Sequence, residues 1–366
     1  MDSRQQEMGS NMQTLQRRST AAIATLVFGA VLAVAASSAV PATAKTGSGS
    51  ASTDRPEAAT AAPAFPTFVH LPADQAAHPT ARAEWWYVIG HVNARGHRFG
   101  YEVTIGGGKD PQVIFSITDK TTGAFYTNSQ SYSHDQTSFS TTALDIRTPS
   151  ATLSGPMDAM RLHATLPVVG EINLTLSAEG PALYNNGTGL MPFLGGTSYY
   201  YSLPSLATQG TLEVNNRTYP VTGESWLDRQ WGNWDWSTMD KWTWMPLQVS
   251  NGDRINLWDL FAEGREASYA TVLRPDGTHE MVAVEPLADT TSDFWTSPIT
   301  GKRYGTRWTV NIPALDASLT VVAKPQGQER QGTFGGTYEG AASVTGRYRG
   351  KPVTGQTYVE QNGNWR

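Results

Sequence analysis

Cysteine is absent from the 366-residue chain. Its absence excludes disulfide bonds, a thiolate nucleophile and metal sites with cysteine ligands. Hydrophobic residues make up 39% of the chain, which is long enough for one large domain or two modest ones. We therefore expect a globular protein whose stability comes from packing of its core.

Charged residues are also few. They make up 16% of the chain, the net charge is −5, and no run of lysine or arginine occurs in its body. Such a composition excludes the basic surface that nucleic-acid binding requires. Seven histidines occur, and none are paired at the spacing of metal ligands. We expect neither nucleic acid nor a metal ion as a partner.

Motifs for a bound cofactor are missing as well. The glycine-rich stretch "GGGKDP" from Gly106 follows a predicted strand but opens no helix, which argues against a phosphate-binding loop. "GES" at Gly223 lacks the second glycine of a nucleophile elbow. The sequence predicts that any chemistry proceeds without a cofactor.

The longest apolar run lies near the N-terminus. A pair of arginines precedes an apolar segment from Ala21 to Val40, and small residues follow it, as in a cleavable signal peptide spanning residues 1–44. An uncut membrane anchor is the alternative, because the run is nearly long enough to span a bilayer. Residues 45–67 are rich in alanine, serine, threonine and proline, which predicts a disordered tether. We expect an exported protein, secreted or attached to the cell envelope, with membrane contact only through an uncleaved signal.

Beyond this segment the pattern indicates strands. Short stretches such as "QVIFSITDK", "INLTLSA" and "ASLTVVAK" alternate apolar and polar residues between turn-forming residues. No window carries a helical apolar stripe. Short regular strands form antiparallel barrels or sandwiches, because closure removes exposed edges. The sequence predicts an all-β fold.

An internal repeat divides the chain. "PVTGESWLDRQWGNW" at Pro220–Trp234 recurs as "PVTGQTYVEQNGNW" at Pro352–Trp365. A weaker similarity links "EWWYVIGHV" from Glu84 with "KWTWMPLQV" from Lys241. Each copy thus opens with a tryptophan-rich strand and closes with a strand carrying glycine, an aromatic residue and a carboxylate. The repeat predicts two tandem antiparallel β-barrel domains, residues 68–236 and 237–366.

Tryptophans concentrate where these domains meet. Seven of the twelve lie between Trp226 and Trp258. They could cement the two domains or form the aromatic wall of a pocket, and domain junctions are frequent ligand sites. The candidate ligand-binding residues are Glu84, Trp86, Tyr87, Trp226, Trp231, Trp244 and Trp258.

The first closing strand carries two candidate catalytic residues. Alternation places Glu224, Trp226 and Asp228 on one face, and puts Arg229 and Trp231 on the other. The repeat supplies Glu360 as a counterpart of Asp228, which favours a structural role for Asp228, whereas Arg229 is peculiar to the first copy. Both residues remain candidates.

Asp259 is the third candidate and the preferred acid. In "INLWDLF" it shares a face with Ile255, Leu257 and Phe261. Desolvation among apolar neighbours raises the pKa of a carboxyl group and enables it to donate a proton near neutral pH. The alternatives are a buried pairing partner or a bulge that turns the side chain outward.

These motifs resemble a known family. "EWWYVIGHV" with "HRFGYEV", and "GESWLDRQWGNW" after them, are similar to signatures of the lipocalin-like family that includes carotenoid 1,2-hydratases, AttH-type proteins, fungal isoflavonoid hydratases and polyketide pericyclases. The resemblance covers roughly Glu84 to Trp365. It implies two lipocalin-like domains with a ligand site at or near their junction.

The resemblance also implies a reaction. Carotenoid hydratases add water across a terminal isoprenoid double bond without a cofactor, and Asp259 beside Trp258 lies about where they place an acid beside an aromatic residue. They carry a histidine in the closing motif, where this chain reads "LDRQW". Three functions remain open: a hydro-lyase or isomerase acting on an apolar alkene, a carrier of a lipid or polyene, and a cofactor-free pericyclase.

Overall fold

The computed structural model describes residues 67–331 and 335–365, which form one compact unit. The predicted signal peptide (residues 1–44) and nearly all of the predicted tether (residues 45–67) lie outside the described residues. Two large antiparallel sheets, a two-stranded sheet and short 3₁₀ helices make up the described unit.

The first sheet contains the N-terminal strands and follows the order β4-β3-β2-β1-β13-β12-β9-β8-β7-β6-β5, with β10 and β11 also pairing β12. Its members are β1 (Ala83–Ala94), β2 (His97–Gly106), β3 (Gln112–Asp119), β4 (Ala124–Ser131), β5 (Ser138–Phe139), β6 (Asp145–Arg147), β7 (Ala151–Ser154), β8 (Met160–Leu166), β9 (Gly170–Ala178), β10 (Leu183–Tyr184), β11 (Leu190–Phe193), β12 (Gly196–Val214) and β13 (Arg217–Asn233).

The second sheet follows the order β17-β16-β15-β14-β24-β23-β21-β20, with β22 pairing β23. Its members are β14 (Met239–Val249), β15 (Arg254–Ala262), β16 (Arg265–Leu273), β17 (His279–Ala283), β20 (Arg307–Ile312), β21 (Ala317–Ala323), β22 (Glu329–Arg330), β23 (Thr337–Tyr348) and β24 (Lys351–Gly363). Strands β18 (Phe294–Thr296) and β19 (Arg303–Gly305) form the two-stranded sheet.

Six short 3₁₀ helices complete the described elements: η1 (Ala73–Gln75), η2 (His134–Gln136), η3 (Asn185–Gly187), η4 (Trp236–Thr238), η5 (Leu287–Thr290) and η6 (Pro313–Leu315). Helix η4 lies in the connection from the first sheet to the second. No helix within the described residues has the length and apolar character needed to cross a membrane.

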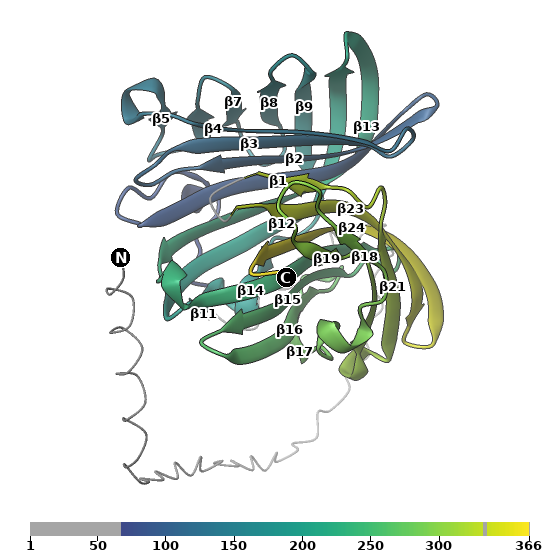
Figure 1. The fold of residues 1–366 in the computed structure, drawn as a ribbon. Helices are drawn as coiled ribbons and strands as arrows, with labels where there is room; N and C mark the ends of the chain where they lie inside the picture. Colours follow the sequence, from purple (N-terminus) through teal and green to yellow (C-terminus); the bar gives the residue numbers. More distant parts are fainter. Residues whose placement is uncertain (1–66, 332–334, 366) are drawn as a thin grey trace, which may run out of the picture. The chain divides into compact units, whose positions relative to one another are not determined.

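Both sheets are strongly curved (Figure 1), and no pairing among the described strands joins β4 to β5 or β17 to β20. Each large sheet is therefore a curled, open half-barrel. The predicted all-β fold with two antiparallel, barrel-like sheets is confirmed.

The same arrangement of four strands occurs in both sheets. The opening strand β1 lies between β2 and β13 in the first sheet, and β14 lies between β15 and β24 in the second. The closing strands β13 and β24 each pair with the preceding long strand, β12 or β23. The sequence repeat thus corresponds to a structural repeat, whereas the exact domain limits at residues 236 and 237 remain a prediction.

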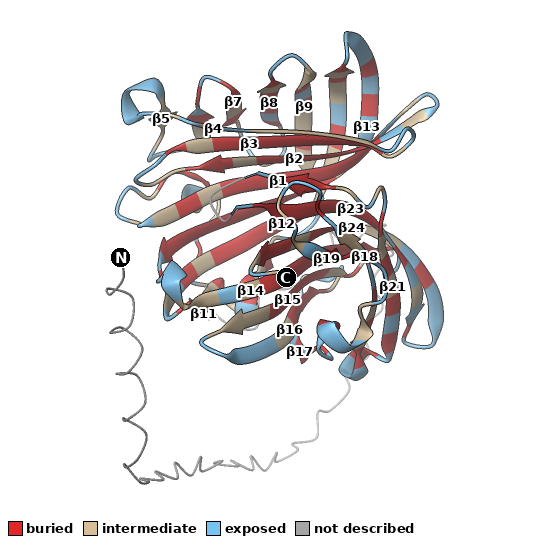
Figure 2. Ribbon diagram, in the orientation of Figure 1, coloured by how far each residue is buried: buried red, intermediate tan, exposed pale blue. Residues whose placement is uncertain are grey.

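The central strands are buried on both faces (Figure 2). Trp86 and Val88 of β1 belong to the hydrophobic core of the first sheet, whereas Tyr87 and Ile89 belong to a cluster between the sheets. Since successive residues of a strand point to opposite faces, "WWYVIGHV" is apolar almost throughout. The other face of the second sheet packs into a separate core around Leu257. The junction between the sheets is thus a third apolar layer.

Candidate active site between the two sheets

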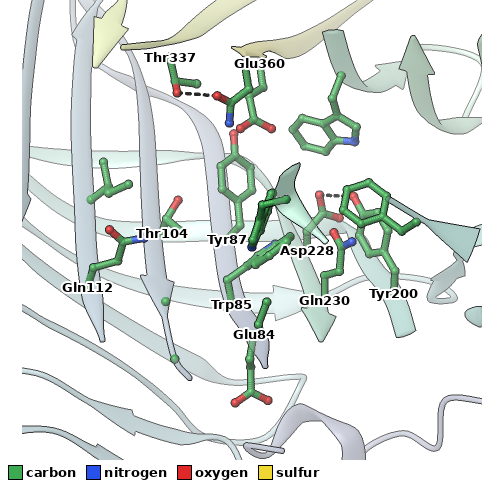
Figure 3. A pocket seen from close by; sticks show the side chains of 18 of the residues that line it. Glu84, Trp85, Tyr87, Thr104, Gln112, Tyr200, Asp228, Gln230, Thr337 and Glu360 are labelled. Atoms are coloured by element: carbon green, nitrogen blue, oxygen red, sulfur yellow. Dashed lines mark hydrogen bonds between the residues drawn. The ribbon is translucent and has the colours of Figure 1, made fainter. Parts of the chain in front are cut away.

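A cavity of about 470 Å³ lies between the two sheets. This volume falls in the range of small-molecule sites. Aromatic side chains form much of its wall, among them Trp85, Tyr87, Tyr200, Trp242, Trp244 and Trp258. Charged residues also line it, and among its carboxylates Asp228 comes from the first sheet and Glu360 from the second (Figure 3). The junction cavity is therefore an apolar space with acidic groups at defined positions.

Asp228 is fixed in this wall by three hydrogen bonds. It lies on β13 opposite Tyr87 of β1 and Ser202 of β12, near the middle of the first sheet. Its Oδ1 accepts hydrogen bonds from Ser202 Oγ at 2.5 Å and Trp226 Nε1 at 2.7 Å. Its Oδ2 accepts one from the Tyr200 hydroxyl at 2.7 Å. The carboxyl group has little freedom to move.

Burial raises the pKa of Asp228 from the ordinary 3.8 to about 7. The side chain is 2% exposed, so the charged form loses most of its hydration. Hydrogen bonds from Ser202, Trp226 and Tyr200 lower the pKa in part, and the negative charge of Glu360 raises it. At neutral pH the group is poised between its acidic and basic forms, which suits a general acid or base.

A chain of side chains extends this network into the second sheet. Asn256 of β15 donates through Nδ2 to the Tyr200 hydroxyl at 2.8 Å, and its Oδ1 accepts from Trp244 Nε1 at 2.9 Å. Each of these donors has an acceptor. The network therefore fixes the side chains of Asp228, Tyr200 and Trp244 relative to one another across the junction.

Tyr200→Phe is expected to raise the pKa of Asp228 further, since it removes a donor that stabilises the carboxylate. It also leaves the buried amide of Asn256 without its closest acceptor, which costs about 1–3 kcal/mol of unfolding free energy. Carboxyl infrared titration and urea unfolding measure the two effects. An unchanged Asp228 titration would contradict this arrangement.

Glu360 faces the cavity from the second sheet. It lies on β24 opposite Trp244 of β14 and Glu339 of β23. Arg330 of β22 approaches both carboxylates, with its Nη2 3.1 Å from Glu339 Oε1 and 3.7 Å from Glu360 Oε1. Tyr87 of the first sheet donates to Glu339 Oε2 at 2.9 Å. The guanidinium of Arg330 is therefore close to the carboxylates of both Glu339 and Glu360.

A third acid joins this cluster. Glu102 of β2 is fully buried and accepts hydrogen bonds from Thr104 at 2.6 Å and Ser116 at 2.9 Å. Burial raises the pKa of Glu102, of Glu339 and of Glu360, the last to about 6, while Arg330 lowers all three. The three carboxylates in turn raise the pKa of Arg330 against its own desolvation. We call Glu102, Glu339, Glu360 and Arg330 the junction acid cluster.

Arg229 lies on the opposite face of β13 from Asp228 and does not line the cavity. Its guanidinium pairs with Glu84, donates to the Ala76 carbonyl at 2.7 Å, and lies 4.0 Å from the centre of the Trp86 ring. The predicted catalytic role of Arg229 therefore lacks a geometric basis, because strand alternation directs it into the first core.

Asp259 is also directed away from the cavity. Its neighbour Trp258 lines the cavity, so alternation along β15 puts Asp259 on the opposite face. There it accepts a hydrogen bond from Ser268 at 2.7 Å. Burial does raise the pKa of Asp259, as the sequence predicted, but the group has no contact with the junction cavity.

The predicted ligand-binding residues separate in the same way. Tyr87, Trp244 and Trp258 line the cavity. Glu84 lies at its edge, with its carboxylate directed away from Asp228 (Figure 3). Trp86 and Trp231 belong to the first core, because strand alternation directs them away from the junction. Trp226 shares the junction face with Asp228 and donates a hydrogen bond to it, but it does not line the cavity.

Sequence reasoning missed Glu360 as a site residue, together with Tyr200 and the partners of Glu360. The repeat contained the signal, because it aligned Asp228 with Glu360 and the two occupy equivalent positions facing one junction. Glu102 and Glu339 are acids in apolar strands, the same signal that drew attention to Asp259. Within the described ranges, 67–331 and 335–365, no three His, Asp or Glu side chains are grouped as metal ligands.

The fold and this cavity define a lipocalin-like protein in which two curled sheets enclose an acidic, aromatic-walled site. The model of the AttH-like family matches residues 62–364, and the chain belongs to that family. The predicted resemblance to AttH-type proteins is thereby confirmed.

Named relatives include enzymes of water addition and removal. The chain is 29% identical over 214 residues to the dehydratase asqC of Emericella nidulans, covering 55% of this chain and 60% of that protein. It is 24% identical over 198 residues to the kievitone hydratase of Fusarium solani subsp. phaseoli, covering 51% of this chain and 55% of that protein. The matches thus span less than two thirds of either relative.

Two solved structures share the fold. A protein of Nitrosomonas europaea described as an AttH superposes with a TM-score of 0.71 at 20% identity, covering 83% of this chain and 99% of that one. The kievitone hydratase of Nectria haematococca superposes with a TM-score of 0.72 at 20% identity, covering 82% and 94%. The lipocalin-like fold is therefore shared across most of the chain.

Proposed function

We propose that the protein is a cofactor-independent hydro-lyase, which adds water to, or removes it from, a carbon–carbon double bond of an apolar small molecule in the junction cavity. The observation that carries this proposal is Asp228, an immobilised carboxyl group in an aromatic-walled cavity whose pKa is raised to about 7. A hydratase and a dehydratase among the relatives support it, since their names denote addition and removal of water.

In the hydration direction, protonated Asp228 delivers its proton to one alkene carbon. A carbocation develops on the other carbon, and a water molecule captures it. Trp244 and Trp258 border the cavity, and the π-electrons of such rings stabilise positive charge. Dehydration follows the reverse path: the hydroxyl group is protonated and leaves as water, and ionised Asp228 takes the proton from the neighbouring carbon to form the double bond.

The substrate is apolar in this proposal because aromatic rings dominate the wall near Asp228. An isoprenoid or polyene with an accessible double bond satisfies that requirement. Export to the cell surface or beyond remains part of the proposal, since the predicted signal peptide lies outside the described residues.

The test uses the purified protein, kievitone as a defined compound and an apolar extract of the cells that carry the gene, each in water labelled with oxygen-18. We expect an alcohol that carries the label with the wild-type protein and with Asp259→Asn, whose side chain lies outside the cavity. We expect almost none with Asp228→Asn.

Other results would replace the proposal. A compound that co-purifies unchanged, without label, would indicate a carrier. An unlabelled isomer formed equally by wild type and Asp228→Asn would indicate a pericyclic reaction, for which the cavity needs only to fold its substrate.

A further inference from the structure

We propose that Glu360 is the second acid–base group of the junction cavity, the base that takes a proton from the attacking water while Asp228 protonates carbon. The inference rests on the proposed function and extends it, because it divides the two proton transfers between the two copies of the repeat.

The structural repeat places the two carboxylates at equivalent positions. Asp228 lies on closing strand β13 opposite residue 87 of the first opening strand. Glu360 lies on closing strand β24 opposite residue 244 of the second. Both line the same cavity, one from each sheet (Figure 3). A molecule in the cavity therefore meets an acidic group on each of two walls.

The surroundings of the two carboxylates differ in a way that assigns their roles. Asp228 is buried and has no cation in contact, which favours its protonated form, and the hydrogen bonds from Ser202, Trp226 and Tyr200 oppose this effect only in part. Glu360 has the Arg330 guanidinium 3.7 Å away, which favours its ionised form. The protonated member can donate to carbon and the ionised member can accept from water.

Glu339 competes with Glu360 for the positive charge of Arg330. The guanidinium is hydrogen-bonded to Glu339 at 3.1 Å and is farther from Glu360. Tyr87 holds the other oxygen of Glu339. Three carboxylates share one cation, so each receives only part of the stabilisation that Arg330 gives to an ionised carboxylate. Glu339 is thus a positioning residue that sets the basicity of Glu360.

The steps balance over one hydration. Asp228 loses a proton to carbon, water forms the new carbon–oxygen bond, and Glu360 receives a proton from that water. Addition of one water leaves Asp228 ionised and Glu360 protonated, and exchange with solvent returns the proton. In dehydration, the carboxyl groups exchange these tasks.

The pH profile is expected to be bell-shaped. The groups that face Glu360 are Tyr87 of β1, Glu102 of β2, Tyr200 of β12, Asp228 of β13, Arg330 of β22 and Glu339 of β23. Hydration requires ionised Glu360, with a pKa of about 6, and protonated Asp228, with a pKa of about 7. The rate therefore falls below about pH 6 and above about pH 7, with both limits belonging to the coupled pair.

Glu360→Gln separates the two proton transfers. The probe is the whole apolar extract, incubated once in oxygen-18 water and once in deuterium oxide. In the variant, we expect labelled alcohol to fall about 10²–10⁴-fold. Deuterium should still enter the alkene, because Asp228 can protonate carbon and recover a proton before water attacks. The residual rate should also lose its decline below about pH 6. Exposed Glu179→Gln is the matched control and should leave both measurements unchanged.

The outcomes distinguish the two proposals. Equal loss of alcohol and deuterium exchange, with an unchanged pH profile, would show that Glu360 serves structure and overturn its assignment as a base. Wild-type alcohol formation in Glu360→Gln would do the same. Persistent alcohol formation in Asp228→Asn would instead overturn the proposed acid, and a loss of alcohol in Glu360→Gln beside it would still support Glu360 as the base.

Discussion

Asp228→Asn is expected to lower the rate of water addition by about 10²–10⁴-fold, the usual contribution of a positioned general acid. Asparagine keeps the shape of the side chain but cannot deliver a proton. Trp226 and Ser202 can still donate to its oxygen, whereas the Tyr200 hydroxyl meets an amide in place of an acceptor. Product formation in oxygen-18 water, followed by mass spectrometry, measures the rate.

The matched control is Asp259→Asn, because Asp259 is equally buried but lies on the opposite face of β15 from the cavity. It should retain the wild-type rate. If Asp259→Asn abolished the reaction and Asp228→Asn preserved it, the acid would be the one favoured by sequence, and the site proposed between the sheets would be wrong.

The free energy of unfolding gives a second, independent measurement on the Asp228→Asn variant. The folded-state pKa of Asp228, about 7, is above its ordinary value of 3.8. The group therefore stabilises the wild-type protein at low pH, and this contribution is lost as pH rises through about 7. Asparagine does not titrate, so the deficit of the variant relative to wild type should shrink between pH 4 and pH 8. A deficit that grows with pH would contradict the raised pKa.

Arg330→Met is expected to lower the free energy of unfolding by about 3–5 kcal/mol, as when one partner of a buried ion pair is removed. Arg330 is 7% exposed and is the cation that lowers the pKa of Glu102, Glu339 and Glu360. Without it, three carboxyl groups must hold protons or remain charged in an apolar junction. Equilibrium urea unfolding measures the difference.

The pH dependence of that loss has a defined sign. Removing Arg330 raises the folded-state pKa of each carboxyl group further, so the variant loses stability as pH rises through those values. The deficit should therefore be largest above about pH 6 and smaller at pH 4. The exposed Arg161→Met should change stability by no more than about 0.5 kcal/mol.

A double variant tests whether the charge itself is responsible. Arg330→Met with Glu339→Gln removes the cation and one of its acids together, so its loss should be smaller than the sum of the two single losses. Strict additivity would mean that Arg330 stabilises the junction through packing of its side chain and not through the junction acid cluster.

Much of the fold could be predicted because its signals are local. Alternation in the strands predicted the all-β class, and the two copies of the closing motif predicted the repeated arrangement around β13 and β24. Face assignments along β1 and β13 also agree with the structure, since Tyr87 and Trp226 face the junction while Trp86 and Trp231 face the first core. A period of two residues suffices for such assignments.

The candidate site was predicted less well. Alternation correctly grouped Asp259 with Leu257, but it could not tell whether that face bordered the junction or the core of the second sheet. Recurrence of the acid in both closing strands favoured a structural role for Asp228. In the structure the recurrence has another consequence, because the two equivalent strands face each other and bring Asp228 and Glu360 to one cavity.

The sequence by itself determined the strand class, the repeat and the two faces of each central strand. Only the tertiary structure decided which face of the first sheet packs against which face of the second. It therefore decided which carboxyl groups line the same cavity. The reason is physical: alternation follows from the geometry of one strand, whereas a pKa near 7 at Asp228 depends on burial by a second sheet and on Glu360, which lies more than a hundred residues away in the chain.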